Sequence, residues 1–230
     1  MTKKGLNQEL HKQILIKILV GIFKELDGKL GFKGGTCAYL FYDLPRISLD
    51  LDFDILKPFT KEDIDNLKLI LGKHGRIKDF REKRFTIFSL LDYKIDAPNI
   101  KVELNKRVWE NNSYKSIWFL GVEGKIVDEA TLLTNKLVAL SDRRLSVARD
   151  IFDAYYLLKL GFPLNEKLIK ERTGKNLKDY LGFLIPFIQN AYTSKNILHG
   201  LGEVLEKKQK EWAKKELIQE TIKEIKRLRV

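Results

Sequence analysis

The chain has 230 residues, of which 44% are apolar and 32% are charged, with 5 prolines and one cysteine. This length suits one or two domains, and the apolar content is too high for a disordered protein. The single cysteine, Cys37, excludes an internal disulfide, and one cysteine with three scattered histidines argues against a structural zinc site. No apolar run approaches the ~20 residues of a membrane span, and the first residues lack the apolar stretch of a signal peptide. We therefore expect a soluble, cytoplasmic protein with no membrane contact.

The charge is strongly basic: 43 Lys and Arg residues against 31 Asp and Glu residues give a net charge of +12. A basic surface raises the local concentration of polyanions, so nucleic acid or a nucleotide is the first partner to consider. A lysine-rich, highly soluble protein would show the same excess. The basic residues are spread along both halves of the chain, so the charge supports a polyanion partner without identifying one.

Residues 10–55 alternate between helical and strand patterns. Apolar residues recur at helical spacing over 10–26 and predict an amphipathic helix. The glycines that follow it leave room for a short strand over 30–33, and 36–42 predicts a short helix. Residues 46–55 alternate strictly between apolar and polar, which predicts a strand with one buried face.

A second group of elements follows. Thr60 and Asp63 have the spacing of a capping box, and they predict the start of a helix that ends at Gly72. The segments rich in β-branched and aromatic residues predict further strands. These strands cover residues 76–80, 84–93 and 100–104, while 117–120 and 125–127 are a further strand or a loop.

The sequence pattern changes after residue 127. Asp128 is the expected N-cap of a helix over 128–140, a second helix covers 146–160, and no strand pattern follows. We therefore predict an α+β protein with a mixed-sheet part over 1–127 and an all-helical domain over 128–230.

The residues that could carry chemistry lie in the first part. Gly34, Gly35 and Thr36 begin the short helix, and Asp50 and Asp52 follow on the strand. Two carboxylates at i and i+2 of a strand point to the same side, where they need a cation or a shared proton. Carboxylate oxygens suit Mg²⁺, and a glycine turn before a helix offers backbone N–H groups to a phosphate. Alternating acids also occur on ordinary solvated strands, but the whole arrangement indicates a nucleotide and metal site.

Two longer motifs carry a family resemblance. The run KGGTCAYLFY over Lys33–Tyr42 and the run RISLDLDF over Arg46–Phe53 resemble the signature of the AbiEii/AbiGii toxin-type nucleotidyltransferases, of the DNA polymerase beta-like superfamily. The family's later Lys and Arg-Asp elements match Lys136 and Arg149-Asp150. The resemblance implies a nucleotidyltransferase-like mixed β-sheet core with flanking helices, then an all-helical C-terminal half, with the active site in the cleft between them.

The resemblance also implies a role for each matching residue. Asp50 and Asp52 would hold the metal, Mg²⁺ or alternatively Mn²⁺, and an NTP would be the substrate. Lys136 would contact the triphosphate, and Asp150 would complete the catalytic set. The residues expected to contact the phosphates are Gly34, Gly35 and Thr36.

Glu103 and Arg46 keep two interpretations each. Glu103 is the candidate third carboxylate and general base, or else an exposed strand residue that pairs with Lys101 or Arg84. Arg46 and Ser48 share the acidic side of the predicted strand and are candidate nucleotide-binding residues. Arg46 either pairs with the aspartates or reaches the nucleotide.

The later helices leave alternatives open as well. Lys136 contacts the triphosphate, or it is an exposed helix lysine. Asp150 and Asp153 share one helical face, where they could orient Lys136 or Arg149.

The expected reaction is Mg²⁺-dependent transfer of a nucleoside monophosphate from an NTP to a hydroxyl acceptor. The resemblance implies an RNA acceptor, the 3′ end of a tRNA, and the role of a toxin beside a separate antitoxin. Nucleotidylation of a protein or small molecule is one alternative. Another is a catalytically silent nucleotidyltransferase fold that binds nucleic acid or a partner, against which the intact Asp50, Asp52 and Lys136 speak.

Overall fold

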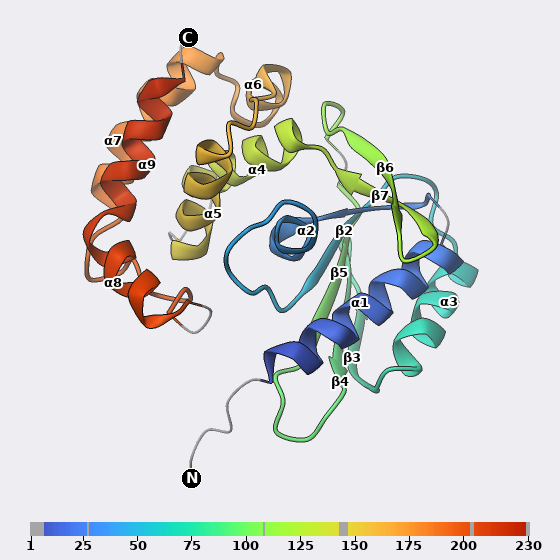
Figure 1. Ribbon diagram of the computed structural model, residues 1–230. Helices are drawn as coiled ribbons and strands as arrows, with labels where there is room; N and C mark the ends of the chain where they lie inside the picture. Colours follow the sequence, from blue (N-terminus) through green and yellow to red (C-terminus); the bar gives the residue numbers. More distant parts are fainter. Residues whose placement is uncertain (1–6, 27, 108, 143–146, 203–204, 229–230) are drawn as a thin grey trace. The chain divides into compact units, whose positions relative to one another are not determined.

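The computed structural model describes residues 7–26, 28–107, 109–142, 147–202 and 205–228. The chain divides into two compact units, and each is described by itself (Figure 1). The first unit contains Met1–Asp43, Ile47–Val108 and Tyr114–Val127, and the second contains Leu44–Arg46, Trp109–Ser113 and Asp128–Val230. The predicted division into functional domains over 1–127 and 128–230 stays a prediction.

Within the described residues, the first unit is built on a mixed sheet of seven strands. The strands are β1 (Leu30–Lys33), β2 (Leu51–Ile55), β3 (Arg76–Glu82), β4 (Thr86–Asp92), β5 (Ile100–Asn105), β6 (Tyr114–Phe119) and β7 (Val122–Val127). Their order is β3-β4-β5-β2-β1-β7-β6. The pairs β1–β7 and β2–β5 are parallel, and the other neighbours are antiparallel. The segment left open between strand and loop is thus the β6–β7 hairpin.

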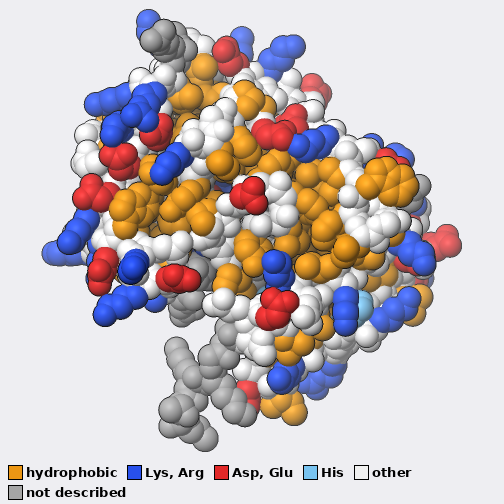
Figure 2. All heavy atoms as spheres, viewed as in Figure 1, with side chains coloured by type: hydrophobic (Ala, Val, Ile, Leu, Met, Phe, Trp, Pro, Cys, Tyr) orange, Lys and Arg blue, Asp and Glu red, His pale blue; other side chains and the backbone are white. Residues whose placement is uncertain are grey.

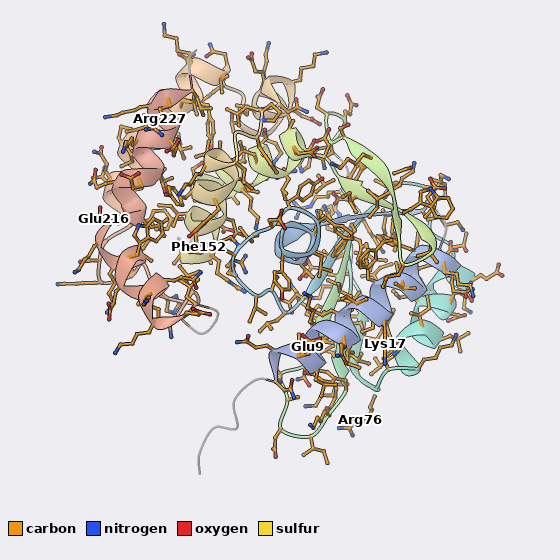
Figure 3. The ribbon with its side chains drawn as sticks, in the orientation of Figure 1. Glu9, Lys17, Arg76, Phe152, Glu216 and Arg227 are labelled. Atoms are coloured by element: carbon orange, nitrogen blue, oxygen red, sulfur yellow. The ribbon has the colours of Figure 1, made fainter. Side chains whose placement is uncertain are left out.

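Three helices accompany this sheet: α1 (Gln8–Glu25), α2 (Gly34–Phe41) and α3 (Lys61–Gly72). α1 and α3 pack against each other and against the sheet, so they cover the same face (Figure 1). Charged side chains such as those of Glu9 and Lys17 extend from the exposed side of α1 (Figure 3). Both hydrogen bonds of the predicted capping box at Thr60 and Asp63 are present. The predicted helices of this unit are thus confirmed, and the strands predicted over 30–33, 76–80, 84–93 and 100–104 are present as β1, β3, β4 and β5.

One predicted strand was too long. β2 begins at Leu51, whereas the alternating pattern predicted a strand from Arg46. β1 ends where the chain turns into α2, so it pairs only with residues 52–55, and β5 pairs with residues 51–54. Residues 46–50 therefore have no neighbouring strand within the described part of the chain. Arg46, Ser48 and Asp50 lie in the segment before β2, not on the strand itself.

In the described part of the second unit, all the secondary structure is helical, as the sequence predicted. These are α4 (Glu129–Asp142), α5 (Ala148–Lys159), α6 (Glu166–Thr173), α7 (Leu177–Ala191), α8 (Lys207–Lys215) and α9 (Leu217–Arg227). The Asp128 carboxylate accepts a 2.8 Å hydrogen bond from the Thr131 N–H, which confirms the predicted N-cap. The predicted start of the second helix at residue 146 lies outside the described residues.

α5 forms the centre of the second unit. It packs against α4 and α9, and its Phe152 is fully buried (Figure 3). Glu216 and Arg227 mark the two ends of α9 in the same view. No helix among the described residues is long and apolar enough to cross a bilayer.

Candidate active site

Three carboxylates come together on one side of β2 and β5 in the first unit. Asp52 on β2 lies opposite Glu103 on β5 in the parallel register. Asp50, directly before β2, accepts a 3.3 Å hydrogen bond from the backbone N–H of Lys101. Along β5, Lys101 and Glu103 are part-exposed on either side of the buried Val102, so they share the face with the aspartates. We call Asp50, Asp52 and Glu103 the acidic cluster.

The ammonium group of Lys101 lies among these carboxylates. Its Nζ atom is 3.6 Å from Asp52 Oδ1, 3.8 Å from Glu103 Oε2 and 3.9 Å from Asp50 Oδ2. Burial acts to lower the pKa of Lys101, but the three carboxylates outweigh it, and the net effect raises the pKa. From the sequence, Lys101 is expected only as a partner of Glu103. Lys101 comes close to Asp50 through the parallel pairing of β2 with β5, which joins residues far apart in the sequence.

The first turn of α2 lies beside Asp52. A Cβ atom on Gly34 would lie 2.7 Å from Oδ2 of Asp52, and the φ of Gly34 is +82°, so this position requires glycine. Gly35 follows in the same turn, and the buried Thr36 donates its hydroxyl hydrogen to the backbone carbonyl of Asp50. Thr36 thus fixes the backbone of the acidic cluster, and its predicted contact with phosphates stays a prediction.

The next acidic residue of β2, Asp54, has a different environment. Its buried carboxylate receives hydrogen bonds from Lys33 Nζ at 2.5 Å, Tyr114 Oη at 2.5 Å and Asn105 Nδ2 at 2.9 Å. Its charge is balanced by a lysine and its oxygens are hydrogen-bonded, so Asp54 stabilises the sheet.

A second charged group lies in the second unit. Lys136 on α4 places its Nζ atom 2.7 Å from Asp153 Oδ2 and 3.8 Å from Asp150 Oδ1, both on α5. Arg46 donates from Nε and Nη2 to the two carboxylate oxygens of Asp153, each at 2.6 Å. Burial acts to raise the pKa of Asp153, but Lys136 and Arg46 outweigh it, and the pKa is lowered. We call Arg46, Lys136, Asp150 and Asp153 the buried ion cluster.

The contacts of the buried ion cluster bear on the alternatives that the sequence left open for Lys136 and Arg46. Lys136 is not an exposed lysine, because its side chain is only 13% accessible. Asp150 and Asp153 do share a face, and both lie at Lys136. Arg46 pairs with Asp153 instead of the expected aspartates of the first unit, and Ser48 is buried in the segment before β2. The predicted approach of Lys136 to the acidic cluster stays a prediction.

The acidic cluster fits a divalent cation in its donor chemistry. Carboxylate oxygens are the ligands that Mg²⁺ prefers, and the cluster already surrounds one positive charge, that of Lys101. Within the described residues, no three His, Cys, Asp or Glu side chains converge closely enough to form a complete metal site by themselves. The predicted role of Asp50 and Asp52 as metal ligands, with water and substrate phosphates as further ligands, stays a prediction.

The sequence model of the AbiEii nucleotidyl transferase toxin family, of type IV toxin–antitoxin systems, matches residues 17–224. The chain belongs to this family. The match extends beyond both motifs on which the resemblance rested, and it confirms that the protein is a nucleotidyltransferase.

Solved structures agree with this assignment. A nucleotidyltransferase candidate from Helicobacter pylori is 20% identical over 96% of this chain and 97% of its own, with a TM-score of 0.60. JHP933 from Helicobacter pylori is 21% identical over 97% of this chain and 95% of its own, with a TM-score of 0.59. An antigenic nucleotidyltransferase-like protein from Paracoccidioides brasiliensis is 18% identical over 81% and 93%, with a TM-score of 0.50. Among curated proteins the chain has no match. At these identities the likeness shows the fold, which is the predicted one.

Proposed function

We propose that the protein transfers a nucleoside monophosphate from an NTP to a hydroxyl of RNA, with Mg²⁺ held by Asp50 and Asp52. The observation that carries this proposal is the acidic cluster, in which three carboxylates lie around the ammonium group of Lys101 beside the first turn of α2. A divalent cation bound there would neutralise the charge of the phosphates during transfer. Mn²⁺ prefers similar ligands and is the alternative metal.

The surrounding residues supply the other parts of the reaction. Gly34 and Gly35 expose the N–H groups of the first turn of α2, which favour a phosphate. Glu103 lies beside Asp52 and could accept the proton of the attacking hydroxyl. Lys136, oriented by Asp150 and Asp153, would contact the triphosphate as a fixed positive charge. Arg46 would act through Asp153, not by binding the nucleotide itself.

The basic surface supports RNA as the acceptor, and we propose the 3′ end of a tRNA. The net charge is +12. On the face drawn in Figure 2, Lys and Arg side chains are scattered among acidic ones. Such a surface suits contacts with the phosphates of a folded RNA at several points. The family is one of toxins, and we propose that a separate antitoxin is the protein partner.

The deciding experiment identifies the molecule that takes up label. The protein is incubated with each α-³²P-labelled NTP, Mg²⁺ and either total RNA or cell protein, and the products are separated on a gel. The proposal predicts label in tRNA, absent in the Asp50→Asn variant. Label in protein or in a small molecule would refute the RNA acceptor and leave the metal site standing.

A further inference from the structure

Lys101 has a place in the first unit that the reaction described above does not explain. Its Nζ atom lies within 3.6–3.9 Å of one oxygen from each member of the acidic cluster. Its side chain is 32% accessible, so the ammonium group can leave the cluster without the chain unfolding. Its backbone N–H also holds Asp50, which fixes the base of the side chain beside the cluster.

The positive charge of Lys101 offsets part of the negative charge of the acidic cluster. Three carboxylates that each have an oxygen within 4 Å of the same ammonium group would repel each other without that cation. Within the described structure, the cation at this point is Lys101. A divalent metal bound by Asp50 and Asp52 needs their oxygens at about 2 Å, and such a metal would repel an ammonium group still among the same oxygens.

We propose that Lys101 is a positioning residue that occupies the place of the divalent metal in the metal-free protein and is displaced when the metal binds. Lys101 thereby holds the acidic cluster in its binding arrangement and competes with the metal. This inference rests on the proposed function, because it takes Asp50 and Asp52 as the metal ligands. It predicts that the protein binds the metal more weakly than the same carboxylates would without the charge of Lys101.

The test measures Mn²⁺ binding to the full chain by electron paramagnetic resonance of the free ion, without nucleotide. Lys101→Met keeps the apolar stem and removes the charge, and Lys101→Gln is a second neutral variant in case the first does not fold. Lys101→Arg keeps the charge. Lys106→Met is the matched control, because Lys106 is similarly accessible, 29% against 32%, and pairs with Glu82 outside the cluster.

We expect the two neutral variants to bind Mn²⁺ about tenfold more tightly than the wild type, because a competing charge has gone. Their melting temperature in EDTA should fall, and Mn²⁺ should raise it by more than in the wild type. Lys101→Arg and Lys106→Met should bind Mn²⁺ like the wild type. A lysine that only supports the fold would lower the melting temperature without tightening Mn²⁺ binding.

Two results would overturn the inference, and they are distinguishable. If the wild type binds Mn²⁺ through Asp50, as Asp50→Asn shows, and the neutral variants bind no more tightly, only the role of Lys101 is wrong. If neither the wild type nor the neutral variants bind Mn²⁺, the metal site of the proposed function is wrong as well.

Discussion

At the scale of single residues, the two charged clusters of this protein differ in how much solvent reaches them. The acidic cluster is part-exposed, with side-chain accessibilities of 30% for Asp52 and 37% for Glu103. Asp153 of the buried ion cluster is fully buried. Charge changes in the first cluster should therefore affect chemistry more than stability, and those in the second should affect both.

Asp52→Asn tests the first half of this contrast. The variant should lose at least about 100-fold in transfer rate, because a charged ligand of the proposed metal becomes neutral. Its free energy of unfolding should change by no more than about 1 kcal/mol, because the ion pair with Lys101 is part-exposed. Rates and urea unfolding are compared with Asp92→Asn, which removes a surface partner of Arg76. Full activity in Asp52→Asn would exclude this residue as a metal ligand.

Lys136→Met tests the second half. Removing this amine leaves Asp153 buried with Arg46 as its remaining close cation among the described residues. We expect the free energy of unfolding to fall by about 2 kcal/mol or more, and NTP binding to weaken in the protein that stays folded. Urea unfolding and nucleotide titration measure the two effects, with Lys170→Met, an exposed lysine of α6, as the control. An unchanged unfolding free energy would refute the stabilising role of Lys136.

At the scale of elements, the junction of β1 and α2 brings the sheet and the proposed phosphate-binding turn together. Gly34 has a left-handed φ of +82° and lies against Asp52, so its lack of a side chain has two separate reasons. Gly174, at the end of α6, has a φ of +72° and open space around the position of a Cβ atom. Substituting Gly174 therefore measures the cost of the left-handed backbone alone. Substituting Gly34 adds the cost of the collision with Asp52.

Gly174→Ala should lower the free energy of unfolding by about 1–2 kcal/mol, the cost of a left-handed alanine. Gly34→Ala should cost more than that, because the methyl group collides with the Asp52 carboxylate, and it should also weaken Mn²⁺ binding. Urea unfolding and metal titration of both variants make the comparison. Equal unfolding free energies with unchanged metal binding in Gly34→Ala would show that Asp52 does not depend on this glycine.

A buried histidine of α1, His11, contacts the segment before β2. His11 Nε2 lies 3.0 Å from the Leu49 carbonyl oxygen, and Nδ1 lies 2.8 Å from Tyr93 Oη. In the neutral ring, Nε2–H donates to Leu49 and Nδ1 accepts from Tyr93. Burial is the main influence on the pKa of His11 and lowers it below 6.5, while Leu49 and Asp50 act in the opposite direction. The folded protein therefore favours the neutral histidine.

A lowered histidine pKa makes the fold sensitive to acid. The contribution of His11 is present above its unfolded pKa of about 6.5 and is lost as the pH falls through the lower folded value. Urea unfolding between about pH 7 and pH 5 should thus show a falling free energy, with a shallower fall in His11→Gln. His199→Gln, an exposed site, is the control and should keep the wild-type slope. Identical slopes in all three proteins would contradict a neutral His11.

Local patterns predicted most elements, because helix periodicity, capping and strand alternation are short-range signals. The β2 strand was overestimated because its length depends on its neighbours, and β1 is short. The end of the described chain contains two helices, α8 and α9, and α9 buries Leu217, Ile222 and Ile225. The helical spacing of these apolar residues is a local signal, whereas the surface that covers them depends on packing against other helices.

Contacts within the candidate site depend even more on residues that are far apart in the sequence. Asp50, Asp52 and Lys136 were found through motifs, since each motif is contiguous along the chain. The contacts of Lys101 with Asp50 and of Arg46 with Asp153 join residues 51 and 107 positions apart. No local pattern encodes such pairs, because they depend on strand register and on helix packing.

At the scale of the whole molecule, the net charge of +12 makes RNA binding the property to measure. If RNA is the acceptor, its association constant should fall with salt on a log–log line with a slope of about −3 or steeper, one unit for roughly each phosphate contacted. Fluorescence anisotropy with labelled tRNA measures the slope. Asp52→Asn should bind tRNA at least as tightly as the wild type while transferring nothing, because it removes a negative charge and leaves every basic residue in place. A salt-independent affinity, or no binding at low salt, would instead favour a protein or small-molecule acceptor.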